Sequence, residues 1–141
     1  MSATLLGSIA RTTAPQTALR RFLALDAVVT TGNGLAYLAF SAPLGRLLGI
    51  GQGLLLELGI FLVLYGAGVA WLASRRQPPV LPVKVVIEGN YAWAALSLAA
   101  VAFWLSPTVA GAAWVPMQAV TVASFALLQQ LALRAVASRG Q

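Results

Sequence analysis

Residues 83–105 read VKVVIEGNYAWAALSLAAVAFWL, an apolar run that is interrupted near its start by Lys84, Glu88 and Asn90. Because a helix rises about 1.5 Å per residue, roughly 20 apolar residues are enough to cross the ~30 Å hydrocarbon core of a bilayer. The run therefore predicts a membrane-spanning helix. Its carboxylate and its amide are costly in lipid, so we expect each of them to face a partner or the membrane surface.

The composition of the whole chain agrees with a lipid environment. Of the 141 residues, 60% are hydrophobic and only 9% are charged, whereas a soluble domain has about 25% charged residues. Three further apolar runs have the length of a membrane span. The sequence therefore predicts an all-α fold, a four-transmembrane-helix bundle with spans at residues 22–40, 54–73, 83–105 and 109–136.

One membrane domain accounts for most of the length. We expect a cytoplasmic or interfacial N-terminal arm over residues 1–21, a single four-helix membrane domain over 22–137 and a short tail over 138–141. The segment PLGRLL, residues 43–48, predicts a short interfacial helix after the first span. A proline soon after a serine, as in Ser41 and Pro43, is typical of the first turn of a helix.

Positive charge is unevenly distributed among the connections. Eight of the nine Lys and Arg residues lie in or next to the N-terminal segment, the second loop and the tail, and only Arg46 lies in the first loop. Cytoplasmic segments of membrane proteins carry the excess of Lys and Arg. Both termini are therefore predicted to be cytoplasmic.

The residue types that are missing exclude several functions. The chain has no cysteine and no histidine, and its acidic residues are Asp26, Glu57 and Glu88. This composition excludes disulfides, thiol chemistry and His-based catalysis, and it disfavours a metal site. The net charge of +6 comes from scattered basic residues, without the dense basic stripe that nucleic acid requires. We therefore expect no catalytic residue, metal, cofactor or nucleic-acid partner.

Polar residues follow one face of the first predicted helix and one face of the fourth. Residues three or four apart in a helix lie one above the other. Because a polar face is costly in lipid, both faces are expected to turn toward the bundle interior or a partner chain. The residues on them are Asp26, Thr30, Asn33 and Tyr37 on the first helix, and Gln118, Thr121, Phe125 and Gln129 on the fourth.

The third predicted helix presents polar groups on two sides. Glu88 and Asn90 are two residues apart, hence about 200° apart around the axis, so one is expected to serve the interior and the other a second contact. Asp26 and Glu88 each lie about 6–8 Å below the predicted cytoplasmic edge, a depth at which they can meet as an intramembrane pair. The candidate polar site comprises Asp26, Thr30, Asn33, Tyr37, Glu88, Asn90, Gln118 and Thr121.

The same residues also have a structural interpretation. A carboxylate one turn inside a membrane helix commonly pairs with a neighbouring cation, here Arg21 or Lys84, or extends to the surface. Asn33, near the middle of its span, is typical of an amide that bridges two helices. Small residues four apart permit close helix approach; the candidates are Gly32 with Ala36, Gly66 with Ala70, and Ala119 with Ala123.

Several segments together carry a resemblance to known proteins. They are LDAVVTTGNGLAYL at residues 25–38, SAPLGRLLGI at 41–50, EGNYAW at 88–93, and SPTVAG, WVPMQAV and FALLQ between residues 106 and 129. In general pattern the chain resembles the small, uncharacterised four-span integral membrane proteins of bacteria that are broadly DoxX-like. The resemblance implies a multi-pass protein of the bacterial inner (cytoplasmic) membrane and implies no particular activity.

Three functions are compatible with the sequence. The first is a non-enzymatic protein that acts by helix–helix association in membrane lipid, as a homo-oligomer or as an accessory subunit of a larger membrane complex. The second is a transporter or binder of a small hydrophobic or cationic molecule that uses an Asp26/Glu88 pair. The third is an enzyme that modifies a lipid or isoprenoid with one of these carboxylates as the acid–base group. Small-residue faces and the lack of catalytic motifs favour the first.

Overall fold

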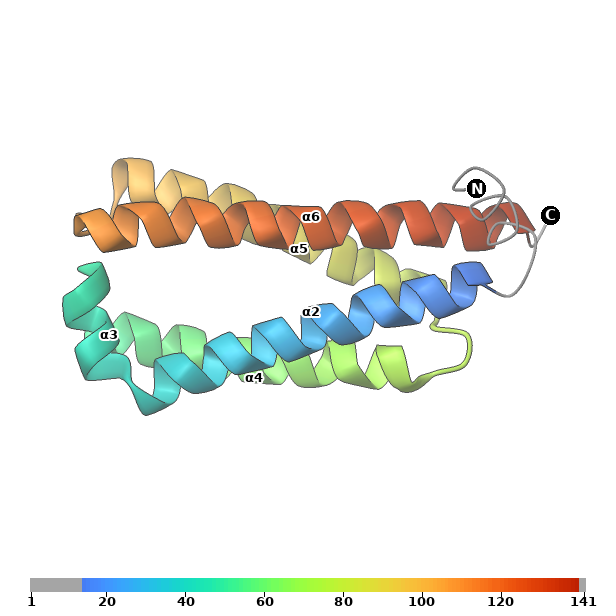
Figure 1. Cartoon of the computed structure of the whole chain (residues 1–141), viewed down its shortest axis with the longest axis horizontal. Helices are drawn as coiled ribbons and strands as arrows, with labels where there is room; N and C mark the ends of the chain where they lie inside the picture. Colours follow the sequence, from blue (N-terminus) through green and yellow to red (C-terminus); the bar gives the residue numbers. More distant parts are fainter. Residues whose placement is uncertain (1–13, 140–141) are drawn as a thin grey trace, which may run out of the picture.

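The computed structural model describes residues 14–139, which form five helices and no strand (Figure 1). Residues 1–13 and 140–141, which include most of the predicted arm and half of the predicted tail, lie outside the described residues. The helices are α2 (Ala14–Ala39), α3 (Ser41–Leu48), α4 (Gln52–Ser74), α5 (Val80–Phe103) and α6 (Val109–Arg139).

Four of these helices, α2, α4, α5 and α6, are long and apolar enough to cross a membrane, which confirms the predicted all-α fold with four spanning helices. Three of them begin earlier than the predicted spans: α2 at Ala14, α4 at Gln52 and α5 at Val80. In α2 and α5, a proline (Pro15 or Pro82) lies in the first turn. The missing N–H of proline leaves no helical hydrogen bond unmade there.

The outer surface of the bundle is apolar. Val28 on α2, Leu64 on α4 and Val120 on α6 are 70%, 68% and 65% exposed. Such large apolar side chains on every side of a bundle suit lipid as the surrounding medium, because soluble monomers rarely expose continuous apolar patches. The class of fold is therefore a multi-pass helical membrane bundle.

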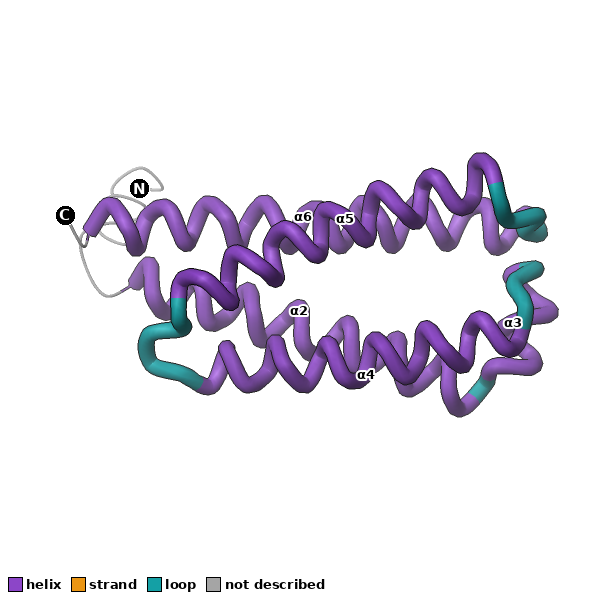
Figure 2. Tube along the Cα trace, turned by 180° about the vertical axis from the view of Figure 1, so that it is seen from behind, coloured by secondary structure: helices purple, strands orange, loops and turns teal. Residues whose placement is uncertain are grey.

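The long helices pack as two pairs. α2 packs along α4, α5 packs along α6, and α2 also contacts α6. The consecutive helices α4 and α5 contact each other only marginally, and they diverge from their connecting loop toward the end of the molecule that carries α3 (Figure 2). The bundle is thus closed between α2 and α6 and loosely joined between α4 and α5.

Close approach of α2 and α4 depends on glycines. A Cβ atom on Gly34 would lie 2.9 Å from the Gly59 carbonyl oxygen, and one on Gly59 would lie 2.9 Å from the Gly34 carbonyl oxygen. Likewise, a Cβ on Gly66 would collide with Thr31. Gly32 makes no such contact within residues 14–139, because nothing lies within 4 Å of where its Cβ would stand. The rotation of α2 turns Gly34, not Gly32, toward α4.

The short helix α3 closes one end of the bundle. The predicted helix over residues 43–48 is present and begins slightly earlier, at Ser41. Gly49 ends it with a left-handed φ of 71°, a conformation that glycine adopts without strain. The backbone N–H of Thr108 donates to the Leu48 carbonyl at 3.2 Å, and the Thr108 hydroxyl accepts from the N–H of Gly111 at 3.2 Å. Thr108 therefore caps α6 and attaches it to α3.

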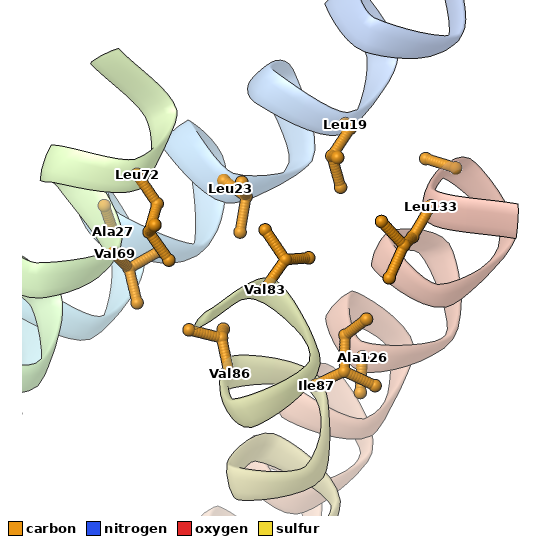
Figure 3. Close-up of a cluster of buried hydrophobic side chains, with 11 residues drawn as sticks. Leu19, Leu23, Ala27, Val69, Leu72, Val83, Val86, Ile87, Ala126 and Leu133 are labelled. Carbon is orange, nitrogen blue, oxygen red and sulfur yellow. The ribbon is translucent and has the colours of Figure 1, made fainter. Parts of the chain in front are cut away.

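The apolar core is divided between the two ends of the bundle. One cluster gathers side chains from α2, α4, α5 and α6, and Figure 3 shows them converging: Leu19, Leu23, Ala27, Val69, Leu72, Val83, Val86, Ile87, Ala126, Ala132 and Leu133. A second cluster lies toward α3 and contains Tyr37, Leu48, Ile50, Leu55, Leu62 and Val115. Buried polar residues lie on the same helices as the first cluster: Asp26, Thr30, Asn90 and Gln129.

Basic residues gather at the end of the bundle where α2 begins, α4 joins α5 and α6 ends (Figure 1). We call this the basic end, and the opposite one the α3 end. Arg20 lies there and donates from its Nε to the carbonyl oxygen of Ala73 at 3.1 Å, where a cation complements the negative end of the α4 dipole. At the α3 end, Arg46 is the basic residue of the short helix.

The α2–α4 contact can be tested with a matched pair of substitutions. Gly34→Ala places a methyl group against the α4 backbone and is expected to destabilise the protein by about 1–3 kcal/mol. Gly32→Ala meets open space and is expected to be neutral or to stabilise by up to about 1 kcal/mol, because alanine favours the helix. Thermal unfolding in detergent measures both. Equal effects of the two substitutions would contradict this close approach of α2 to α4.

Candidate functional site

A fully buried carboxylate lies at the centre of the bundle. Asp26 on α2 is 0% exposed, and its Oδ1 accepts the hydroxyl hydrogen of Thr30 at 2.9 Å. Its Oδ2 accepts from the Asn90 amide of α5 at 2.8 Å and from the Gln129 amide of α6 at 2.8 Å. One carboxylate therefore joins three of the four spanning helices.

The fourth spanning helix is joined through a tyrosine. The Tyr65 hydroxyl of α4 donates to the Asn90 Oδ1 at 3.1 Å and to the Val86 carbonyl oxygen at 3.0 Å. Gly89 provides the space, because a Cβ there would lie 3.1 Å from the Tyr65 hydroxyl. Asn90 completes the arrangement by donating to the Gln129 Oε1 at 3.1 Å. We call the set Asp26, Thr30, Tyr65, Asn90 and Gln129 the Asp26 network.

The Asp26 network is consistent with the cost of polar groups in lipid. An unpaired polar group in hydrocarbon costs several kcal/mol, and here each buried member hydrogen-bonds to another. Within residues 14–139, the side chains that donate to Asp26 are neutral. The expected ion pair with Arg21 is not formed, because Arg21 is exposed. The carboxylate is stabilised by hydroxyl and amide donors.

Glu88 does not join Asp26. It is exposed, and it lines a groove of about 500 Å³ between α5 and α6 together with Lys84 and Arg134. The predicted Asp26/Glu88 intramembrane pair is therefore wrong. The physical reason is the rotation of α5, which turns Asn90 toward Asp26 and so turns Glu88, nearly opposite on the helix, away from the interior. The expectation that Glu88 and Asn90 make contacts on different sides of the helix agrees with this arrangement.

A pocket of about 220 Å³ adjoins the Asp26 network, between α4 and α5. We call it the network pocket. Thr30, Tyr65 and Asn90 supply its polar atoms, and the other lining residues are Phe61, Leu62, Gly89, Ala92, Trp93, Leu96 and Val122. The Phe61 and Trp93 rings stack across the boundary between α4 and α5, with centroids 5.9 Å apart and an angle of 8° between their planes.

A second pocket, of about 270 Å³, lies toward α3 and shares Trp93 and Leu96 with the first. We call it the distal pocket. Two predicted site residues line it: Tyr37, whose hydroxyl accepts from the Trp114 Nε1 at 2.9 Å, and Gln118, whose Oε1 accepts from the Trp93 Nε1 at 2.8 Å. Each pocket is somewhat smaller than the sites for drug-sized ligands, which measure about 300–1,000 Å³, so each suits a smaller molecule.

The predicted polar site is thus only partly brought together. Asp26, Thr30 and Asn90 share one network, whereas Tyr37 and Gln118 lie at the distal pocket. Besides Glu88, two predicted members lie outside both groups. Asn33 is half-buried, and Thr121 is exposed and donates its hydroxyl to the carbonyl of Met117 one turn earlier.

Two essential residues are missing from the predicted site. Gln129 is on the predicted polar face of α6. Gln118 lies on the same face, eleven residues earlier, so the sequence alone does not show which of the two glutamines reaches Asp26. Tyr65 stands alone among apolar residues of α4. Its isolation in a span, where a hydroxyl needs a partner, is the only signal that could have identified it.

The fold and the site together define the class of protein. This is a multi-pass helical membrane protein in which a buried carboxylate joins the spans and an apolar, aromatic-lined cavity adjoins it. No family model, no curated protein and no solved structure matches the chain.

Gln129 and its neighbour Gln130 allow a matched test of the network. Gln129→Met removes one of the two donors to the Asp26 Oδ2, and it is expected to lower the free energy of unfolding by about 1–3 kcal/mol. Gln130→Met removes a half-buried group that accepts from Tyr91 at 3.1 Å, and it is expected to cost under about 1 kcal/mol. Chemical unfolding in mixed micelles measures both. A loss for Gln130→Met as large as that for Gln129→Met would contradict the account.

Proposed function

We propose that this protein is a non-enzymatic membrane protein that binds a small, mainly hydrophobic molecule between α4 and α5. The observation that carries the proposal is the pair of adjoining pockets at the loosely packed boundary of these two helices. Their walls are apolar and aromatic, with a few polar atoms at fixed positions. This combination is typical of sites that bind small apolar ligands.

Access from the lipid supports this function. Phe61 is 50% exposed and Leu96 is 61% exposed, although both line the network pocket. The pocket is therefore bounded on its membrane side by side chains that also face lipid. A lipid-soluble molecule reaches it by displacing these side chains, without first crossing into water.

The polar network fixes the positions of the polar groups in the wall of the network pocket. Thr30, Tyr65 and Asn90 are held by hydrogen bonds to Asp26, Val86 and Gln129 rather than by the ligand. Preorganised groups of this kind do not pay an ordering cost when a ligand binds. The Asp26 network is therefore the rigid wall of the site, and the α4–α5 boundary is its adaptable wall.

A binding role is supported over catalysis by the residues that line the two pockets. Within the described part of the chain they include no Asp, Glu, Lys or Arg, so no carboxylate, ammonium or guanidinium group directly faces the bound molecule. The Asp26 carboxyl group is separated from the cavity by its own donors.

Self-association is the second candidate function, as a homo-oligomer or within a larger membrane complex. Gly32 on α2 and Gly68 on α4 have nothing within 4 Å of a built Cβ, so the backbones of these helices are open to a further helix. Native mass spectrometry from lipid nanodiscs distinguishes the two ideas. A dimer that Gly68→Leu converts to monomer supports association, and a monomer at all concentrations contradicts it.

The location that we propose is the bacterial inner membrane, with the basic end in the cytoplasm, in line with the charge bias and with the DoxX-like resemblance. Because the chain has no cysteine, single cysteines can report the orientation. In intact cells, a membrane-impermeant maleimide is expected to label Ser106→Cys, at the α3 end. It should label Gln77→Cys, in the α4–α5 loop, only after permeabilisation. The opposite pattern would invert the proposed topology.

The binding role is tested by filling the cavity. Leu96 lines both pockets, whereas Leu98 on the same helix lines neither. Wild-type protein in nanodiscs is expected to bind 2-naphthol saturably in equilibrium dialysis, above the partition into empty nanodiscs. Leu96→Trp should abolish the saturable part, because the larger side chain occupies the ligand volume, and Leu98→Trp should retain it. Equal binding by both variants would contradict this location of the site.

A further inference from the structure

The hydrogen-bond donors of the polar side chains at the network pocket are already used. A hydroxyl has one donor hydrogen and a primary amide has two. Thr30 donates to Asp26, and Tyr65 shares its single hydrogen between the Asn90 Oδ1 and the Val86 carbonyl oxygen. Asn90 donates to Asp26 and to Gln129. Trp93, the remaining lining side chain with an N–H, donates to Gln118. None of these side chains has a hydrogen left for a ligand.

Acceptor positions remain on the same atoms. A hydroxyl oxygen and an amide carbonyl oxygen each have two lone pairs. Among the described residues, the Thr30 and Tyr65 hydroxyl oxygens accept no hydrogen bond, and the Asn90 Oδ1 accepts one, from Tyr65. The pocket wall therefore offers acceptors and no side-chain donors, so it is complementary to a ligand that donates.

The donor on the ligand is expected to be neutral. The side chains that line the network pocket carry no charge, and Asp26 behind them is 0% exposed with both oxygens engaged. An ammonium group would lose its hydration without reaching the carboxylate directly, which is costly in a membrane. A neutral hydroxyl group loses much less hydration free energy than an ammonium group when it leaves water.

We propose that the network pocket is selective for a lipid-soluble alcohol or phenol, whose O–H donates to the acceptor oxygens of Thr30, Tyr65 and Asn90 while its apolar body extends along Phe61, Trp93 and Leu96. This inference rests on the proposed binding function and specifies its ligand class. The distal pocket differs: the Tyr37 hydroxyl accepts from Trp114 and donates to no partner among residues 14–139. A wall that offers acceptors without a free side-chain donor is therefore particular to the network pocket.

A matched pair of probes tests the inference. 2-Naphthol donates a hydrogen bond, and 2-methoxynaphthalene has the same ring system without the donor. Equilibrium dialysis against nanodiscs, corrected for partition into empty nanodiscs, gives the affinity of each. The wild type is expected to bind the naphthol roughly three- to tenfold more tightly than the ether, the range that one net hydrogen bond provides.

Substitutions in each pocket test which residues cause the preference for the naphthol over the ether. Thr30→Val and Tyr65→Phe each remove acceptor lone pairs from the network pocket, and at least one is expected to lower the ratio of naphthol affinity to ether affinity. Tyr37→Phe removes a hydroxyl from the distal pocket and should keep the preference. The ether affinity also reports whether each variant still folds around an intact cavity.

The possible results distinguish a failure of the donor preference from a failure of the proposed binding function. Saturable binding of both probes with equal affinity overturns the donor preference and leaves the binding function standing. A preference that survives in both Thr30→Val and Tyr65→Phe also overturns it, because the donor is then recognised elsewhere. If neither probe binds saturably to the wild type, the proposed binding function falls and the inference falls with it.

Discussion

The structure depends on one constraint: a carboxylate inside a lipid-embedded bundle has to be surrounded by hydrogen-bond donors. Asp26 satisfies it with a hydroxyl from its own helix and with amides from α5 and α6. Because these donors come from different helices, the solvation of one side chain fixes the rotation of three helices at once. Tyr65 extends the same constraint to α4 through its bond to Asn90.

The position of the cavity follows from this arrangement. Glycines bring the backbones of α2 and α4 together, and the network draws α2 toward α5 and α6. Between α4 and α5 the network supplies only the hydrogen bonds of Tyr65, and these two helices diverge toward the α3 end. Aromatic rings fill part of the space between α4 and α5, and the rest forms the two pockets. A rigid polar wall therefore faces a loosely packed one, an arrangement suited to a ligand that arrives from the bilayer.

Composition and the lengths of the apolar runs were sufficient to predict four spanning helices, because each run is long enough for one helix to cross the membrane. The polar face of the first helix also indicated Asp26 and Thr30 correctly as interior residues. The partner of Asp26 could not be predicted, since the choice between Glu88 and Asn90 depends on the rotation of α5, which its contacts with α6 and with Asp26 set together. For the same reason the spacing of Gly32 and Gly34 did not reveal which of them meets α4. Which helices pair is a property of the whole bundle.

The most direct test of the central claim is a double-mutant cycle between Asp26 and Asn90, measured as free energies of unfolding in mixed micelles. Asp26→Leu and Asn90→Leu each leave buried polar groups unpaired, whereas the double variant removes both sides of the contact. The double variant is expected to cost less than the sum of the single ones, with a coupling of about 0.5–3 kcal/mol. Additivity of the two substitutions within about 0.3 kcal/mol would contradict the claim that this carboxylate and this amide hold the helices together.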